Sequence, residues 1–199
     1  MSKIVGITGG IASGKSTLTA FLRQEGYQVV DADAVVHDLQ APGGRLYQAL
    51  VEHFGQGIIL ENGQLNRVKL GQLIFSDERE QAWSRQVQGQ IIREELAREK
   101  ERLSQQEDLF FMDIPLLFEA GYESWFDEVW LVYVDEKEQL KRLMARNHLS
   151  QEEAEKRLAA QWKLADKRAL ADKILDNNGS LERLLHQAAE LLKEGGNHQ

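Results

Sequence analysis

Cysteine is absent from the 199 residues of this chain. Disulfides and thiolate metal sites are therefore excluded, and we expect an intracellular, cytoplasmic protein. No apolar run approaches the roughly 20 residues that a membrane-spanning helix needs, so a membrane is not an expected partner. The net charge of −8 makes the whole-protein field repel polyanions, which disfavours nucleic acid as a partner. A phosphorylated ligand must instead be held by local lysine and arginine side chains.

Short apolar runs alternate with helical patterns along the chain, and the length fits one domain. Near-continuous apolar runs are typical of strands that are buried on both faces of a sheet. Strand–helix alternation predicts an α/β fold, a doubly wound parallel sheet with right-handed crossovers. The five expected strands are residues 4–8, 28–30, 109–113, 129–134 and 174–176.

Two insertions interrupt this alternation. The first, about 34–106, is longer than a crossover requires and predicts a substrate-binding lobe made of helices at 43–54, 66–75 and 77–106, the last capped by Asp77. The second predicts a lid, about 136–171, with helices at 136–146 and 150–170 that are separated by a break at 147–149. A capping box at 150–153 marks the start of the second lid helix. The remaining core segments are 1–33, 107–135 and 172–194.

The strongest local motif is Gly-Gly-Ile-Ala-Ser-Gly-Lys-Ser at residues 9–16, directly after the first apolar run. In the pattern G-x-x-x-x-G-K-[ST], glycines let backbone N–H groups surround phosphates at the start of a helix. A glycine-rich structural turn is the alternative, which the flanking strand and helix patterns disfavour. We therefore predict that the chain binds a nucleoside triphosphate. Lys15 should reach the β- and γ-phosphates and Ser16 should bind Mg²⁺; the predicted nucleotide contacts are Ala12, Ser13, Gly14, Lys15, Ser16 and Thr17.

Carboxylates end the second and third expected strands. Because ligands gather at the carboxyl ends of parallel strands, Asp33 is our candidate general base, with an N-cap of a helix at 34–40 as its alternative role. Asp113 resembles the Walker B carboxylate and is predicted to support Mg²⁺, although it has the alternative role of an ordinary turn residue. Glu119 either lines the cleft or has no role in the site.

Basic side chains in the lid are candidates for stabilising the transferring phosphoryl group. Arg142 and Arg146 are four residues apart and so share one helix face. Charge spreads over the phosphoryl oxygens during transfer, and arginines carried by a closing lid would stabilise it. The alternative for each is a solvated helix face paired with glutamates. His37, one turn after Asp33, either meets a substrate phosphate or packs locally.

Several further segments agree with one known family in both order and spacing. They are Asp-Ala-Asp at 31–33 with His37, Leu-Asn-Arg at 65–67, Asp-Ile-Pro-Leu-Leu-Phe-Glu at 113–119, Arg142 with Arg146, Arg157 with Gln161, and Asp-Asn-Asn-Gly-Ser at 176–180. Together with the loop, they mean that the chain resembles bacterial dephospho-coenzyme A kinase over essentially its whole length.

The resemblance implies a P-loop kinase fold of three layers, with a five-stranded parallel sheet, a helical CoA lobe and a helical lid. It implies transfer of the ATP γ-phosphoryl group to the 3′-hydroxyl of dephospho-CoA, the last step of CoA synthesis, with Mg²⁺. It places Asn177 in the adenine-contacting turn and His37, Asn66 and Arg67 at the substrate. We expect a monomer or a weak homo-oligomer.

Two positions depart from the family pattern. Ala12 stands where the family usually has glycine, and we expect it to keep a negative φ, so that the loop is intact. Gln88-Gly89 stands where the family usually has His-Pro, which would kink the long helix, so details of the CoA lobe stay open.

Two other functions compete with this interpretation. The first is a kinase of similar architecture that acts on another small hydroxyl acceptor, such as a nucleotide or a sugar acid. The second is a GTP-binding switch protein, which would read guanine with an N-K-x-D-type segment; the chain offers only Ala-Asp-Lys at 165–167 and 171–173.

Overall fold

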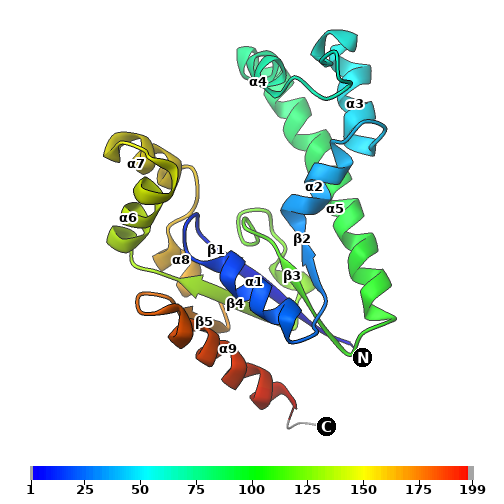
Figure 1. The fold of residues 1–199 in the computed structure, drawn as a ribbon. Helices are drawn as coiled ribbons and strands as arrows, with labels where there is room; N and C mark the ends of the chain where they lie inside the picture. The colour runs from blue at the N-terminus through cyan, green and yellow to red at the C-terminus, as the bar shows by residue number, and fades with distance from the viewer. Residues whose placement is uncertain (1, 197–199) are drawn as a thin grey trace. The chain divides into compact units, whose positions relative to one another are not determined.

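The computed structural model describes residues 2–196, which form two compact units. The first unit contains the chain up to Val30 and from Ser104 onwards, and the second contains Asp31–Leu103. Figure 1 follows the chain through both.

A five-stranded sheet with the order β2-β3-β1-β4-β5 organises the first unit. The pairs β1–β3, β1–β4 and β4–β5 are parallel, which confirms the predicted α/β class and parallel sheet. The strands are β1 Lys3–Gly9, β2 Val29–Asp31, β3 Leu109–Asp113, β4 Glu128–Tyr133 and β5 Lys173–Asp176. Each predicted strand is present, with its ends within one residue of the expected ones.

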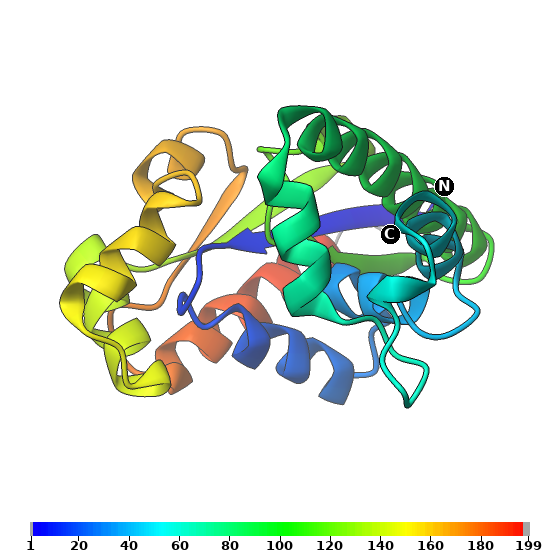
Figure 2. The same cartoon turned by 90° about the horizontal axis from the view of Figure 1, so that it is seen from above.

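One face of the sheet is covered by two helices that lie side by side, α1 Lys15–Gln24 and α9 Leu181–Gly196 (Figure 2). Leu22 of α1 and Leu184 of α9 are fully buried in the same apolar cluster as Phe111 of β3. Burying one such side chain contributes about 1.5–3 kcal/mol relative to leaving it exposed. This cluster holds β1 and β3 in place, and the loop at residues 9–16 begins at the carboxyl end of β1.

The strand order also places the switch in winding direction at β1. The chain leaves β1 for β2 beyond β3, returns through β3, and then crosses to β4 on the other side of β1. In open α/β sheets, ligands bind outside the carboxyl ends of the strands at such a point. The motif at residues 9–16 therefore lies at the edge of the sheet where binding is expected.

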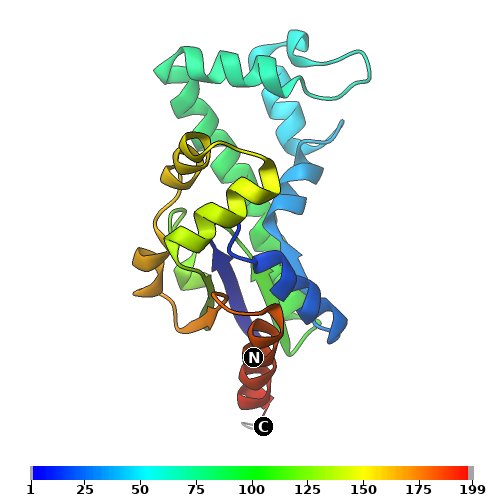
Figure 3. The ribbon, with the colours of Figure 1, turned by 60° about the vertical axis from the view of Figure 1, so that its left-hand side comes forward.

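Three helices follow β4: α6 Glu136–Asn147, α7 Gln151–Ala159 and α8 Leu164–Arg168. Helices α6 and α7 pack against each other (Figure 3), and the capping box between Ser150 and Glu153 is confirmed. The prediction of one helix over 150–170 is wrong, because the chain leaves the helix after α7 and re-enters one at α8. Leu164 of α8 packs with Leu131 and Val134, so this short helix belongs to the apolar core beside β4.

The second unit is helical, as predicted for the insertion after β2. Its apolar cluster contains Leu39, Leu46, Leu50, Ile58, Leu65 and Leu70. Its helices are α2 Ala32–Leu39, α3 Arg45–Phe54, α4 Arg67–Ser76 and α5 Glu78–Ser104. Helix α5 runs without a break through Gln88-Gly89, consistent with the absence of proline there.

Helix α5 is also the longest helix, at 27 residues. Its apolar content is low, and across residues 2–196 no helix has the combination of length and apolar character that a membrane span requires.

Candidate active site

The loop after β1 turns sharply into α1 at Gly14. This glycine is the N-cap of α1 and has φ 96° and ψ 12°, a left-handed conformation that glycine adopts without penalty. A Cβ at Gly14 would also overlap the side-chain nitrogen of Asn177. Both the backbone angle and the close contact therefore require glycine here, and the N-terminus of α1 is left open to an anion.

Ala12 differs from its expectation. It has φ 60°, so it lies in the left-handed region, and the prediction of a negative φ is wrong. A residue with a Cβ pays about 1–2 kcal/mol for this conformation. The surrounding contacts of the loop therefore hold Ala12 against its own preference.

Lys15 and Asp113 form an ion pair at the carboxyl ends of two adjacent strands. Lys15 is in the first turn of α1, and Asp113 ends β3 beside Ile7 of β1. Their side chains are 16% and 6% exposed, so the pair is largely removed from water. An ammonium and a carboxylate at this edge supply one group suited to phosphate oxygens and one suited to a hard cation.

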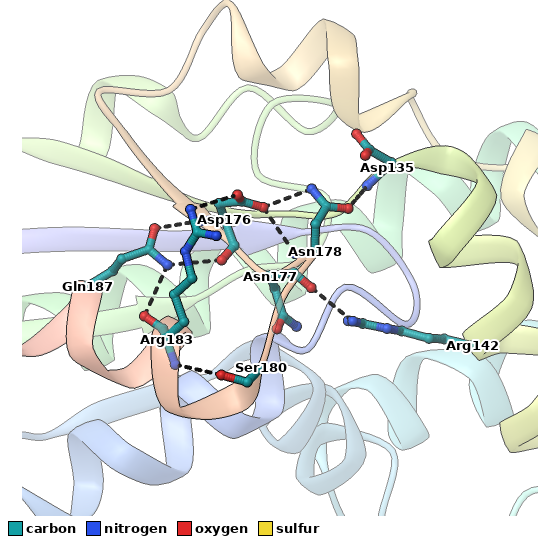
Figure 4. A network of polar contacts seen from close by, with 8 residues as sticks. All are labelled: Asp135, Arg142, Asp176, Asn177, Asn178, Ser180, Arg183 and Gln187. Atoms are coloured by element: carbon teal, nitrogen blue, oxygen red, sulfur yellow. Dashed lines mark hydrogen bonds and ion pairs between the residues drawn. The ribbon is translucent and has the colours of Figure 1, made fainter.

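Asn177 holds the loop at residues 9–16 through a buried hydrogen bond. Its side chain is fully buried, and its amide nitrogen donates to the Ser13 carbonyl at 2.7 Å. Arg142 of α6 donates to the Asn177 carbonyl at 2.9 Å (Figure 4). It also donates to a carboxylate oxygen of Glu138 at 2.9 Å. Arg142 is thus fixed next to the residue that holds the loop.

The turn that contains Asn177 is held by its neighbours. Asn178 donates to Asp176 from both its backbone and its side chain, at 3.0 and 2.7 Å, and its side-chain oxygen accepts from the Asp135 N–H (Figure 4). The backbone N–H of Asn178 is the main reason why the pKa of Asp176 is lowered, and its side chain and Arg183 act in the same direction. The turn therefore carries a stable negative charge.

The other two arginines singled out in the sequence, Arg146 and Arg157, lie on exposed helix positions. Arg146 is in the last turn of α6 and donates to the side chain of Asn147 at 3.0 Å. Arg157 is exposed near the end of α7. Of these three candidates, Arg142 is bonded to Asn177, the residue that holds the loop, whereas Arg146 and Arg157 are exposed.

Four predicted residues belong to the second unit: Asp33, His37, Asn66 and Arg67. The expected helix at 34–40 begins earlier, at Ala32, and its N-cap is Asp31, whose carboxylate accepts from the N–H groups of Asp33 and Ala34 at 2.9 and 3.1 Å. The alternative role of Asp33 as the N-cap is therefore wrong, and its side chain is exposed.

The remaining three have local contacts of their own. His37 is exposed, with its ring 3.7 Å from the carboxylate of Asp38. Asn66 caps α4 by accepting from the Lys69 N–H at 3.0 Å, and Arg67 is exposed at the first position of that helix.

Sequence reasoning missed a buried ion pair below the end of β3. Lys167 of α8 is fully buried, lies 2.7 Å from Glu119 and donates to the Pro115 carbonyl at 3.1 Å. Thr8 donates to the same carbonyl at 3.1 Å. Glu119 is 14% exposed and is linked through Lys167 to the turn that follows Asp113; its place in the cleft stays a prediction. The partners are far apart in sequence, and no local pattern signals them.

The loop is also bonded to two glutamines that were not among the predicted site residues. Gln139 of α6 donates to the Ile11 carbonyl at 2.8 Å, and Gln161 accepts from the Ile11 N–H at 3.0 Å.

The chain is similar to known proteins along nearly its whole length. The model of the dephospho-CoA kinase family matches residues 3–183. A dephospho-CoA kinase of Streptococcus pneumoniae is 65% identical over 196 residues, which cover 98% of this chain and 97% of that protein. The solved structure of the dephospho-CoA kinase from Campylobacter jejuni has a TM-score of 0.76 and 26% identity, and the match covers 99% of this chain and 100% of the other. A crystal structure of a Thermus thermophilus protein has a TM-score of 0.78 and 37% identity, with 97% of both chains covered.

The family match extends over far more than half of the sequence, and the similarity to the curated Streptococcus relative is high along nearly the full length of both chains. A phosphate-binding loop, with its lysine, also lies at the switch point of a parallel sheet, as a kinase requires. The chain belongs to the dephospho-CoA kinase family, and it is a phosphotransferase.

Proposed function

We propose that this protein transfers the γ-phosphoryl group of ATP to the 3′-hydroxyl of dephospho-CoA and releases CoA and ADP. The observation that carries the proposal is the loop at residues 9–16, with Lys15 and Asp113 paired at its mouth, in a chain of this family. We also expect the protein to act in the cytoplasm as a monomer or a weak homo-oligomer.

The loop binds the triphosphate by its backbone N–H groups and the N-terminus of α1. In the proposed reaction the Lys15 ammonium leaves the Asp113 carboxylate and binds the β- and γ-phosphates. The carboxylate and the phosphates are both oxygen anions, and the lysine side chain is flexible enough to exchange one for the other. Its charge matters most as negative charge moves toward the β–γ bridge oxygen. Asn177 is buried under Ser13, so we propose that it serves ATP by holding the loop.

Mg²⁺ suits the donors that this site offers. Ser16 is the second residue of α1 and Asp113 is the last residue of β3, and the hydroxyl and carboxylate of these residues are hard oxygen ligands. Between residues 2 and 196 there is no cluster of three or more His, Cys, Asp or Glu side chains that would hold a metal alone. This fits an ion that takes one or two protein ligands and completes its shell with phosphate and water. When bound, Mg²⁺ neutralises charge on the phosphoryl oxygens.

Asp33 accepts the proton of the acceptor hydroxyl. Its carboxylate follows the end of β2 and is not used to cap α2, since Asp31 has that role. His37 lies one turn further along α2, and Asn66 and Arg67 begin α4, where a cation and a helix N-terminus are suited to the phosphates of the CoA moiety.

Arg142 and Arg146 stabilise the charge on the transferring group. Arg142 is already bonded to the turn that supports the loop, whereas Arg146 must approach when the lid (residues 136–171) closes. Closure would also exclude water, which competes with the acceptor hydroxyl for the phosphoryl group.

An ADP-release assay with a panel of acceptors tests this proposal. ATP, Mg²⁺ and enzyme are mixed with dephospho-CoA, AMP, gluconate, shikimate or no acceptor. We expect ADP release with dephospho-CoA to exceed that with each other acceptor by orders of magnitude in kcat/KM. Equal or faster turnover with AMP or a sugar acid would overturn the assigned acceptor, and turnover that ignores every acceptor would overturn the phosphotransfer itself.

A further inference from the structure

The backbone of Ile11, in the middle of the phosphate loop, is bonded on both sides to glutamine side chains from distant segments. Its N–H donates to the side-chain oxygen of Gln161 at 3.0 Å, and its carbonyl accepts from the side-chain nitrogen of Gln139 at 2.8 Å. A backbone N–H can only donate and a carbonyl can only accept, so the orientation of each glutamine amide is fixed by its partner.

Each of these hydrogen bonds sets the direction of one peptide plane. In a planar trans peptide the C=O and the following N–H point in opposite directions. Gln139 holds the Ile11 carbonyl, so the N–H of Ala12 must point away from Gln139. Gln161 holds the Ile11 N–H, and on the opposite edge of that plane the Gly10 carbonyl accepts from the Ser13 N–H at 3.1 Å.

This arrangement encloses the strained residue of the loop. Ala12 has φ 60°, which is unfavourable for alanine. The planes on its N-terminal side are held by the two glutamines, and the Ser13 carbonyl on its C-terminal side is held by Asn177 at 2.7 Å. Three side-chain amides thus define the loop backbone from Ile11 to Ser13.

Gln139 is a rigid support. It lies on α6 and is 7% exposed, and a Cβ on Gly10 would come within 2.5 Å of its side-chain nitrogen. A buried amide that loses its partner pays a desolvation cost of about 1–3 kcal/mol. The close approach of the Gly10 backbone and the burial of the amide together make the bond to Ile11 part of the folded state.

Gln161 is supported by fewer neighbours. It lies in residues 160–163, the segment that joins α7 to α8, and lines a cavity of about 900 Å³ together with Gln139, Leu158, Trp162 and Leu164. The Gln161 N–H donates to the Leu158 carbonyl at the end of α7, the Trp162 N–H donates to Glu119 at 3.3 Å, and the exposed Lys163 side chain lies 3.6 Å from Glu136. The side chain of Gln161 itself is bonded to the Ile11 N–H, so its orientation depends on the loop.

We propose that Gln139 and Gln161 are positioning residues that pre-organise the phosphate loop. Gln139 turns the Ala12 N–H toward the phosphates, and Gln161 holds the Ile11 N–H away from them and ties residues 160–163 to the loop. The inference rests on the proposed function only in that the loop binds nucleotide phosphates. It does not depend on which acceptor receives the phosphoryl group.

Gln139 must donate a hydrogen bond and Gln161 must accept one, so each can be tested with a substitution that removes only that capacity. Gln139 must donate, so Gln139→Met, which has a similar shape and no donor, should weaken ADP binding by about tenfold, the value expected for losing a well-placed bond to a charged group. The probe is ADP itself, titrated calorimetrically. Gln151→Met is the matched control, because Gln151 is exposed on α7 and bonds only Glu155 in its recorded side-chain contacts.

Gln161 must accept, so the readout is hydrogen exchange at the Ile11 amide, followed by NMR in the ADP-free enzyme. Gln161→Met should speed exchange at Ile11 by about tenfold, the factor expected for losing one hydrogen bond. Gln161→Glu keeps an acceptor and should restore slow exchange. Thermal unfolding of each variant separates these effects from general destabilisation, because a purely structural role would not respond to donor or acceptor identity.

Three results would overturn the proposal: ADP affinity of Gln139→Met equal to that of the control, unchanged Ile11 exchange in Gln161→Met, or equally fast exchange in Gln161→Met and Gln161→Glu. Should Gln139→Met fail to fold, the Gln161 pair decides alone. Neither measurement involves dephospho-CoA, so a wrong acceptor assignment would leave both results unchanged.

Discussion

Replacing Ala12 with glycine should stabilise the protein, although the same change is unfavourable at most positions. Ala12 has φ 60°, and an L-residue with a Cβ pays about 1–2 kcal/mol in this region. Glycine does not pay this cost, but it loses about 0.5–1 kcal/mol more conformational entropy on folding. The difference lies between about 0 and 1.5 kcal/mol, so Ala12→Gly is expected to raise the free energy of unfolding by about 0.75 kcal/mol, or the Tm by about 1.5–3 °C for a chain of this size.

Ala145→Gly is the matched control. Ala145 is exposed within helix α6, where the right-handed conformation suits alanine, so the change should cost about 1 kcal/mol. The two variants are compared by thermal and urea unfolding under the same conditions. We expect the free energy of unfolding to rise in Ala12→Gly and to fall in Ala145→Gly. If Ala12→Gly destabilises the protein as much as Ala145→Gly does, the left-handed conformation of Ala12 and the argument built on it are wrong.

Four further predictions concern the site. Lys15→Ala should lower kcat far more than it weakens ATP binding, and near-normal kcat would remove Lys15 from the catalytic residues. Asp33→Asn should lower kcat by about 10²-fold, the low end for a general base, with stability unchanged in urea; preserved kcat would leave the base unassigned. Because the pKa of Asp176 is lowered, its charge stabilises the fold above the ordinary value of 3.8, and this contribution is lost as pH falls through the lowered pKa. Asp176→Asn should therefore be less stable than the parent at pH 6, with a gap in unfolding free energy that narrows below pH 3.8; a constant gap would contradict this. Amide hydrogen exchange over α6 and α7 should slow when ATP-site and acceptor-site ligands are bound together, and equal rates with and without ligands would indicate a fixed hairpin.

The sheet was predictable because its strands are short runs of apolar residues that can be recognised locally. The run Leu-Phe-Phe-Met at 109–112, for example, lies in a strand buried on both faces, and such a run stands out in a chain with many charged residues. The phosphate loop was predictable for a similar reason, since its glycines and lysine are needed at fixed spacings.

The features that sequence reasoning missed are set by contacts between distant residues. Residues 160–163 contain no glycine or proline, so nothing local ends the helix there; the Gln161 side chain and the Trp162 N–H instead bond to Ile11 and Glu119. Asp31 and Asp33 have the same side chain two positions apart, and only the backbone geometry at the end of β2 decides which one caps the helix.

The positive φ of Ala12 is also set by contacts between distant residues. Alanine favours a negative φ, and local preference predicts it. The bonds that fix the carbonyls of Ile11 and Ser13 come from Gln139 and Asn177, which lie more than 100 positions away. Tertiary contacts override the local preference at this point of the loop.

The identity of the phosphorylated product tests the central claim most directly. The enzyme is incubated with Mg²⁺-ATP and dephospho-CoA, and the product is analysed by mass spectrometry and phosphorus NMR. The account predicts one added phosphate per molecule, on the ribose 3′-hydroxyl, formed in equal amount with ADP. ADP formed without a phosphorylated product, or a phosphate on any other oxygen of dephospho-CoA, would contradict it.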